Sequence, residues 1–191
     1  MKYYYEPISL GVIERHIDVN THEILYHKTH AGEEGDSYKI SPKTFDGYDL
    51  VTTPTNAEGE MTEGIIEVEY YYSRTASVKV EYLDKETKGK IAEDVIIHGH
   101  ENDDYTTEKK DIEGYVLDGN PTNEKGKMQV TKHADGTYET QTVVQYYYTK
   151  KQLQVIEEYI NIHDNTVIES IKHIGTIGDK YEIHPKEIEG Y

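Results

Sequence analysis

Hydrophobic and polar residues alternate with a period of two along much of the chain. Residues 78–82 have the sequence Val-Lys-Val-Glu-Tyr, and residues 66–72 place Ile, Val, Tyr and Tyr at every second position. This alternation predicts β-strands with one buried face. Residues 153–159 nearly follow the same pattern, with Glu157 at a position where the alternation requires an apolar residue, and residues 90–99 are predicted as a further strand.

Residue types that favour strands outnumber those that favour helices. The chain has 33 Ile and Val against 14 Leu, Ala and Met, and β-branched residues prefer strands. Residues 107–112 could form a single helical turn, which Pro42 and Pro185 would start or limit in the other two copies. The sequence therefore predicts a mainly β fold with at most one short helical turn in each module.

Four markers recur three times in fixed register, so the chain contains internal repeats. From the first Tyr of each Tyr-Tyr-Tyr triplet, a Gly follows after 29 residues, a Tyr after 35, and a Gly-Tyr pair after 44. The triplets are Tyr3–Tyr5, Tyr70–Tyr72 and Tyr146–Tyr148; the glycines are Gly32, Gly99 and Gly175; the single tyrosines are Tyr38, Tyr105 and Tyr181; and the pairs begin at Gly47, Gly114 and Gly190.

These markers divide the chain into modules, which we expect to form an elongated tandem array. Residues 1–5 are predicted to be the last strand of a preceding repeat. Residues 6–74 form the first repeat, 75–150 the second, and 151–191 a truncated third. The second repeat has nine extra residues, and Asp135-Gly136 between two alternating runs predicts a longer hairpin near 128–142.

Composition excludes several classes of protein. The 37 acidic and 20 basic residues give a formal net charge of −17, which would repel a nucleic-acid backbone. No apolar run is long enough to insert into a membrane. The chain has no Cys, and it lacks the phosphate-loop, nucleophile-elbow and cofactor motifs, so we expect it not to be an enzyme. Its 19 Tyr supply the large apolar rings that a core needs.

Three segments of the second repeat form a recognisable pattern: residues 78–84, Ile-Glu-Gly-Tyr-Val-Leu at 112–117, and the closing aromatic strand 143–148. In these segments the repeat resembles the MucBP (mucin-binding protein) repeat of Gram-positive surface adhesins. It implies compact modules related to the β-grasp fold, in tandem along an extracellular protein of the cell wall that engages mucin or other host glycoproteins. The first repeat departs from the pattern, with Arg15 and His16 in place of Tyr82 and Leu83.

Two tyrosines are candidate binding residues. Because side chains alternate along a strand, Tyr70 and Tyr72 are predicted to lie in the core, while Tyr71 and, by the same argument, Tyr147 point to the opposite face. There they could stack on sugar rings, or simply pack on the sheet. Two functions stay open at this point. One is adhesion to host mucin glycans or glycoproteins through many weak contacts, and the other is a passive stalk that projects a separate binding head.

Acidic turns are candidate calcium sites, although solvated turns are the simpler interpretation. Oxygen ligands at a turn suit Ca²⁺, yet the spacing matches no EF-hand loop. Histidines at 27, 30, 98 and 100 have no metal-binding motif, so no zinc site and no other cofactor is predicted. The expected partners are a host glycoprotein and neighbouring repeats. The candidate calcium ligands are Glu33, Glu34, Asp36, Glu101, Asp103 and Asp104.

Overall fold

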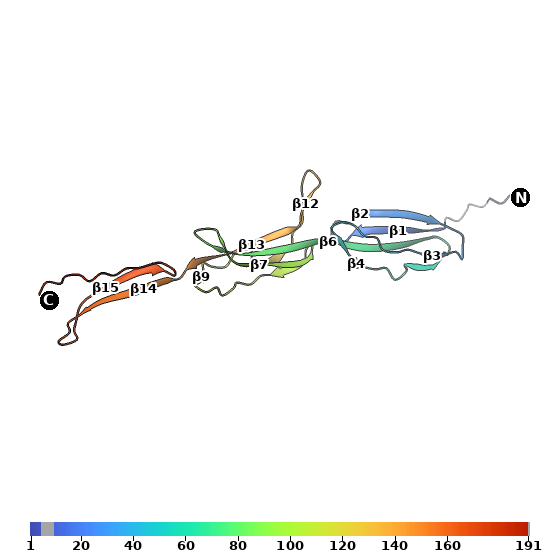
Figure 1. Ribbon diagram of the computed structural model, residues 1–191. Helices are drawn as coiled ribbons and strands as arrows, with labels where there is room; N and C mark the ends of the chain where they lie inside the picture. Colours follow the sequence, from blue (N-terminus) through green and yellow to red (C-terminus); the bar gives the residue numbers. More distant parts are fainter. Residues whose placement is uncertain (5–9, 191) are drawn as a thin grey trace. The chain divides into compact units, whose positions relative to one another are not determined.

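Every regular element in the described part of the chain is a β-strand (Figure 1). The computed structural model describes residues 1–4 and 10–190, and it contains no helix in this part of the chain, so the predicted mainly β fold is confirmed. The strands are β1 (Gly11–Asp18), β2 (Ile24–Ala31), β3 (Ser37–Lys39), β4 (Tyr48–Thr52), β5 (Glu58–Glu60), β6 (Ile65–Asp84), β7 (Lys90–His100), β8 (Asp104–Thr106), β9 (Tyr115–Leu117), β10 (Lys125–Lys127), β11 (Thr131–Lys132), β12 (Tyr138–Glu139), β13 (Gln141–Lys150), β14 (Gln152–Ile160) and β15 (Val167–Thr176).

The chain divides into two compact units. The first unit contains Met1–Lys79, Ile96–Thr106 and Lys125–Val143, and the second contains Val80–Val95, Thr107–Glu124 and Val144–Tyr191. Strands β6, β7 and β13 contribute residues to both units. Residues 74 and 75, where the sequence divides the first repeat from the second, both lie inside β6.

Tyrosines fill the core of the first unit, as the alternation predicts. Strand β1 pairs with β2 in antiparallel and with β6 in parallel orientation, and β4 pairs with the other edge of β6. Tyr70 and Tyr72 on β6 are each 1% exposed. They pack with Val12 on β1 and with Ile40 and Met61 from the connecting segments. Each buried ring removes about 150–250 Å² of surface from water.

The second unit has the same kind of core. Tyr82 on β6 stacks on Tyr146 of β13, with ring centroids 5.7 Å apart. Tyr148 packs against the ring of Tyr82. Strand β13 pairs with β6, and β9 pairs with β13. Strands β14 and β15 form an antiparallel hairpin. This hairpin corresponds to β1–β2 in the first repeat and to the end of β6 with β7 in the second.

The helical turn considered for residues 107–112 does not form. The backbone N–H of Lys110 donates to the Tyr148 hydroxyl at 3.0 Å, and that hydroxyl donates to the Lys110 carbonyl at 2.9 Å. Both backbone groups of Lys110 are thereby used by a buried side chain instead of by a helix.

The recurring glycines have identifiable steric roles. Gly47 and Gly114 adopt φ angles of 72° and 80°, a backbone conformation that glycine reaches without strain. A Cβ on Gly99 would meet the Met128 sulfur at 2.9 Å and the Asp103 carboxylate at 3.0 Å. This Gly is therefore required because a methionine and a turn aspartate pack directly against its backbone.

The predicted hairpin of the second repeat is confirmed. Strands β11 and β12 pair antiparallel, and Gly136 at the tip has φ 86°. The Asp135 carboxylate accepts a hydrogen bond from the Thr137 backbone at 2.9 Å, which fixes the turn. At the N-terminus, a strand was predicted for residues 1–5, but residues 1–4 belong to no strand in the structure, and Tyr5 lies outside the described residues. No helix in the described part of the chain has the length and apolar character needed to cross a membrane.

Candidate functional site

Tyr71 lies on the outer face of β6, but its ring is half-buried. Its hydroxyl donates to the Glu69 carboxylate at 2.6 Å, and the same carboxylate binds Arg15 at 2.9 Å. The hydrogen bond to Glu69 raises the pKa of the Tyr71 hydroxyl. The Tyr71 hydroxyl therefore belongs to a local polar network. Because the ring is only half-buried, part of it stays accessible to a ligand.

Tyr147 occupies the equivalent position on β13. Its hydroxyl donates to the Gln145 side chain at 2.8 Å, and its ring is also half-buried. The Lys88 ammonium lies 4.5 Å from the ring centroid. Both tyrosines were predicted on the outer face and are found there, but neither ring is fully open to solvent.

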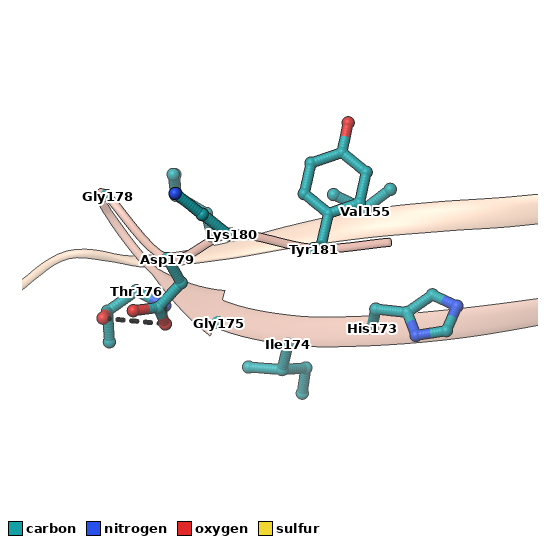
Figure 2. A pocket seen from close by; sticks show the side chains of 10 residues that line it. Val155, His173, Ile174, Gly175, Thr176, Gly178, Asp179, Lys180 and Tyr181 are labelled. Carbon is teal, nitrogen blue, oxygen red and sulfur yellow. Dashed lines mark hydrogen bonds between the residues drawn. The ribbon is translucent and has the colours of Figure 1, made fainter. Parts of the chain in front are cut away.

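The acidic turns are built around one aspartate that caps the backbone. The carboxylate of Asp36 accepts a hydrogen bond from the Glu33 backbone at 2.8 Å, and Asp103 accepts one from His100 at 2.8 Å. Figure 2 shows the same turn in the third repeat, where Asp179 accepts from the backbone and hydroxyl of Thr176. These aspartates explain why an acidic residue recurs at the turn, because each satisfies an otherwise unpaired N–H group.

The remaining candidate calcium ligands do not converge on this aspartate. Glu33, Glu34 and Asp104 are exposed, Glu101 is half-buried, and Asp104 binds the Lys127 ammonium at 3.1 Å. Burial, followed by the charge of Asp18, raises the pKa of Glu101. Within the described residues, no group of three or more acidic, His or Cys side chains is arranged to hold a metal ion.

A buried polar cluster in the first repeat was missed in the sequence. Glu14 is 3% exposed and His16 is fully buried. One oxygen of the Glu14 carboxylate lies 2.8 Å from His16 Nε2, and the other lies 2.8 Å from His30 Nε2. His16 Nδ1 lies 2.9 Å from the Tyr72 hydroxyl.

One arrangement of donors satisfies every hydrogen bond in this cluster. The Tyr72 hydroxyl accepts from the Lys43 backbone at 3.0 Å, so its own hydrogen is available to His16 Nδ1. His16 then carries its proton on Nε2 and donates it to Glu14. The ring of His16 also stacks on Tyr70, with centroids 5.1 Å apart and planes 7° from parallel. Every polar atom of the buried imidazole therefore has a partner.

The surroundings stabilise the charged form of Glu14. Burial by itself raises the pKa of this carboxyl, but hydrogen bonds from His16 and His30 and the nearby charge of Lys43 outweigh burial. The net result is a pKa below the ordinary value of 4.5. The Lys43 ammonium lies 3.5 Å from the carboxylate.

The structure corrects the alignment of the first two repeats by one residue. Asp18 and Asp84 cap equivalent turns, because each carboxylate accepts from the backbone two residues later at 2.8–2.9 Å. His16 therefore corresponds to Tyr82, and Arg15 corresponds to Glu81 instead of to Tyr82. Arg15 points outward and binds Glu67 and Glu69.

The second repeat replaces the polar cluster with apolar side chains, and the third retains part of it. Four residues before the capping residues Asp18, Asp84 and Asn161 stand Glu14, Val80 and Glu157. Two residues before the recurring glycines stand His30, Ile97 and His173. In the third repeat His173 Nε2 lies 2.7 Å from the Glu157 carboxylate. The interaction between His30 and Glu14 in the first repeat therefore has a counterpart in the third.

The comparison with protein families decides the identity of the repeats. The MucBP domain matches three stretches, residues 12–73, 77–149 and 154–191. The chain belongs to the MucBP domain family. The resemblance inferred from the Ile-Glu-Gly-Tyr segment is thereby confirmed.

Relatives with MucBP-like sequence occur in Listeria monocytogenes. The chain is 32% identical over 195 residues to internalin J of serotype 4b, covering 97% of this chain and 20% of the relative. It is 35% identical over 171 residues to internalin J of serovar 1/2a, covering 84% of this chain and 19% of the relative. The MucBP chain thus spans about a fifth of the length of these relatives.

Solved structures with similarity to the MucBP chain include two repeat proteins. The type 2 repeat of the mucus binding protein MUB from Lactobacillus reuteri has a TM-score of 0.28 and 14% identity, covering 74% of this chain and 99% of that one. SHIRT domains 3–4 from a streptococcal cell surface protein have a TM-score of 0.26 and 8% identity, covering 74% and 98%.

Proposed function

We propose that this chain is the repeat region of a bacterial surface adhesin and that its MucBP repeats bind host mucin glycans or glycoproteins. The observation that carries the proposal is the threefold match to the MucBP family over residues 12–73, 77–149 and 154–191. The proposal includes location outside the cell, at the cell wall, and binding instead of catalysis. It also takes residues 6–74, 75–150 and 151–191 as successive copies of one module.

Weak binding by each copy is consistent with the surface. The accessible ring area at Tyr71 and Tyr147 is limited, since both rings are half-buried. Stacking on one ring would give a modest affinity, which repetition along the chain multiplies through effective concentration. The net charge of −17 favours neutral sugars over sialylated or sulfated ones. A bridging Ca²⁺ at the acidic turns would relax that preference and stays a prediction.

Binding of the full chain to mucin tests this proposal. The chain is displayed at high density on beads, and retention on immobilised mucin is measured with and without a chelator. We expect the paired substitutions Tyr71→Ala and Tyr147→Ala to reduce retention at least about tenfold, because weak contacts act multiplicatively in a multivalent display. Tyr181→Ala, which removes an exposed tyrosine that is not a candidate binding residue, is the matched control.

A passive stalk is the alternative function, and one observation favours it. Strand β6 continues without interruption for 20 residues from the end of the first repeat into the second. A continuous strand gives a stiff connection, which suits a spacer. The absence of mucin retention at any display density would favour the stalk over the adhesin.

A further inference from the structure

Arg74 lies on β6 at the junction of the first two repeats, between two aromatic rings of the first compact unit. Its guanidinium carbon lies 4.3 Å from the ring centroid of Tyr48 and 3.4 Å from that of Tyr138. Tyr48 is the cross-strand partner of Arg74 on β4. Tyr138 comes from the inserted hairpin of the second repeat.

The first repeat holds Arg74 and Tyr48 in place. The Arg74 guanidinium donates to the Tyr48 hydroxyl, which in turn donates to the buried Asp18 carboxylate at 3.1 Å. The following residue, Thr75, donates its backbone N–H to the Gly47 carbonyl at 2.9 Å. Contacts within the first repeat therefore hold the Arg74 guanidinium beside Tyr48 without any contribution from Tyr138.

The second repeat brings the ring of Tyr138 to the same guanidinium. The backbone of Ser77 donates to the carbonyl of Thr140 at 2.8 Å, which ties the base of the hairpin to β6. On the hairpin itself, Lys132 is the cross-strand partner of Tyr138 and lies 5.5 Å from its ring. Tyr138 is half-buried, although most of the hairpin around it is exposed.

The junction of the second and third repeats has a different chemistry. The residue equivalent to Arg74 is Lys150, two positions after the closing Tyr, and it is exposed. Gly114, the equivalent of Gly47, lies against Ile177, where an added Cβ would approach a methyl group to 3.1 Å. β13 and β14 are separate strands at this point, whereas β6 is continuous.

We propose that the nine-residue insertion of the second repeat is an inter-repeat brace, in which Tyr138 clamps Arg74 against Tyr48 and restrains the joint between the first two repeats. A guanidinium close to two rings gains cation–π attraction from each of them. The brace depends only on contacts within the protein, so it does not require that the repeats bind glycans. Its functional role is to limit bending between the first and second repeats. The joint between the second and third repeats lacks this brace and has the contact of Gly114 with Ile177 instead.

Distance distributions between spin labels test the brace in the full chain. Because the chain has no Cys, labels attach only at introduced positions. Lys28→Cys in the first repeat and Lys125→Cys in the second are exposed sites that span the joint. We expect Tyr138→Ala to broaden this distribution about twofold or more, whereas Tyr138→Phe, which keeps the ring, leaves it narrow.

A second label pair separates the brace from general loosening of the chain. Lys109→Cys and Lys172→Cys are exposed positions across the next joint, and their distribution should not change in Tyr138→Ala. An unchanged width at the first joint in Tyr138→Ala would overturn the proposal. Equal broadening at both joints would also overturn it, because the effect would then not be specific to the brace.

Discussion

The first and second repeats build the same strand frame around opposite core chemistries. In the first repeat Tyr72 passes its hydroxyl hydrogen to His16, which donates to the buried Glu14. In the second repeat Tyr148 passes its hydrogen to the Lys110 carbonyl, and a stack of tyrosine rings fills the space of the imidazole. The frame thus accepts either a fully paired polar cluster or an apolar one.

The two cores depend on different interactions for their stability. A buried polar cluster is stable only while each donor has an acceptor, since losing one member leaves the others unsatisfied. An aromatic core depends instead on filled volume. The neighbours also differ: Phe45 packs against His16 in the first repeat, and the smaller Ile112 stands at the equivalent sequence position in the second.

The largest effect is expected when the aromatic core loses its central ring. Tyr82→Ala should lower the free energy of unfolding of the second repeat by about 4 kcal/mol, because it leaves a cavity against Tyr146 and Tyr148. Chemical denaturation followed by residue-resolved NMR measures this loss. Tyr147→Ala is the matched control, since its ring is half-buried. An equal loss in both variants would mean that ring burial does not determine the stability.

A smaller loss is expected when the polar cluster loses its acceptor. Glu14→Gln should destabilise the first repeat by about 2 kcal/mol, because the amide cannot accept charge-assisted bonds from two imidazoles at once. The same NMR-monitored denaturation reports it. Glu157→Gln in the third repeat, where the carboxylate is more accessible, should cost less. A cost at Glu157 equal to that at Glu14 would contradict the role given to burial.

The first repeat should also be the more acid-sensitive of the two. The pKa of Glu14 is lowered in the folded protein, so its contribution to stability is complete above the ordinary value of 4.5 and is lost as the pH falls through the folded pKa. The second repeat has Val80 at this position and lacks that contribution. The stability difference between wild type and Glu14→Gln, measured from pH 7 to pH 3, should shrink at acid pH; a constant difference would contradict the assignment.

The smallest effect concerns the outer face of the first repeat. Arg15 binds Glu67 and Glu69 on the partly solvated side of β6. Arg15→Ala should therefore change the free energy of unfolding by less than about 1 kcal/mol. A loss as large as that of Glu14→Gln would show that Arg15, and not His16, occupies the core position equivalent to Tyr82.

The sequence predicted the features that depend on local pattern. Alternation placed Tyr70 and Tyr72 inside and Tyr71 outside, and the Asp135-Gly136 pair located the hairpin. These predictions succeed because side-chain direction in a strand has a fixed period of two. The repeat spacing likewise identified Gly47 and Gly114, which both adopt positive φ in the structure.

The polar cluster could not be found from local pattern. His30 meets Glu14 only through the register of β1 and β2, and Tyr72 meets His16 only through the parallel pairing of β1 and β6. One signal was available: aligning the repeats on Asp18 and Asp84, which cap the same turn, would have placed His16 at the core position of Tyr82. Arg74 was missed for the same reason, since Tyr138 approaches it from an insertion 64 residues later.

Transplanting the second core into the first repeat tests the central claim most directly. The measurement is amide hydrogen exchange of β6 residues 68–72 in a variant carrying Glu14→Val, His16→Tyr, His30→Ile and Phe45→Ile. If one frame accepts both chemistries, these amides stay protected at pH 7 and lose the acid sensitivity of the wild type. Loss of their protection at pH 7, with the second repeat still protected, would contradict the claim.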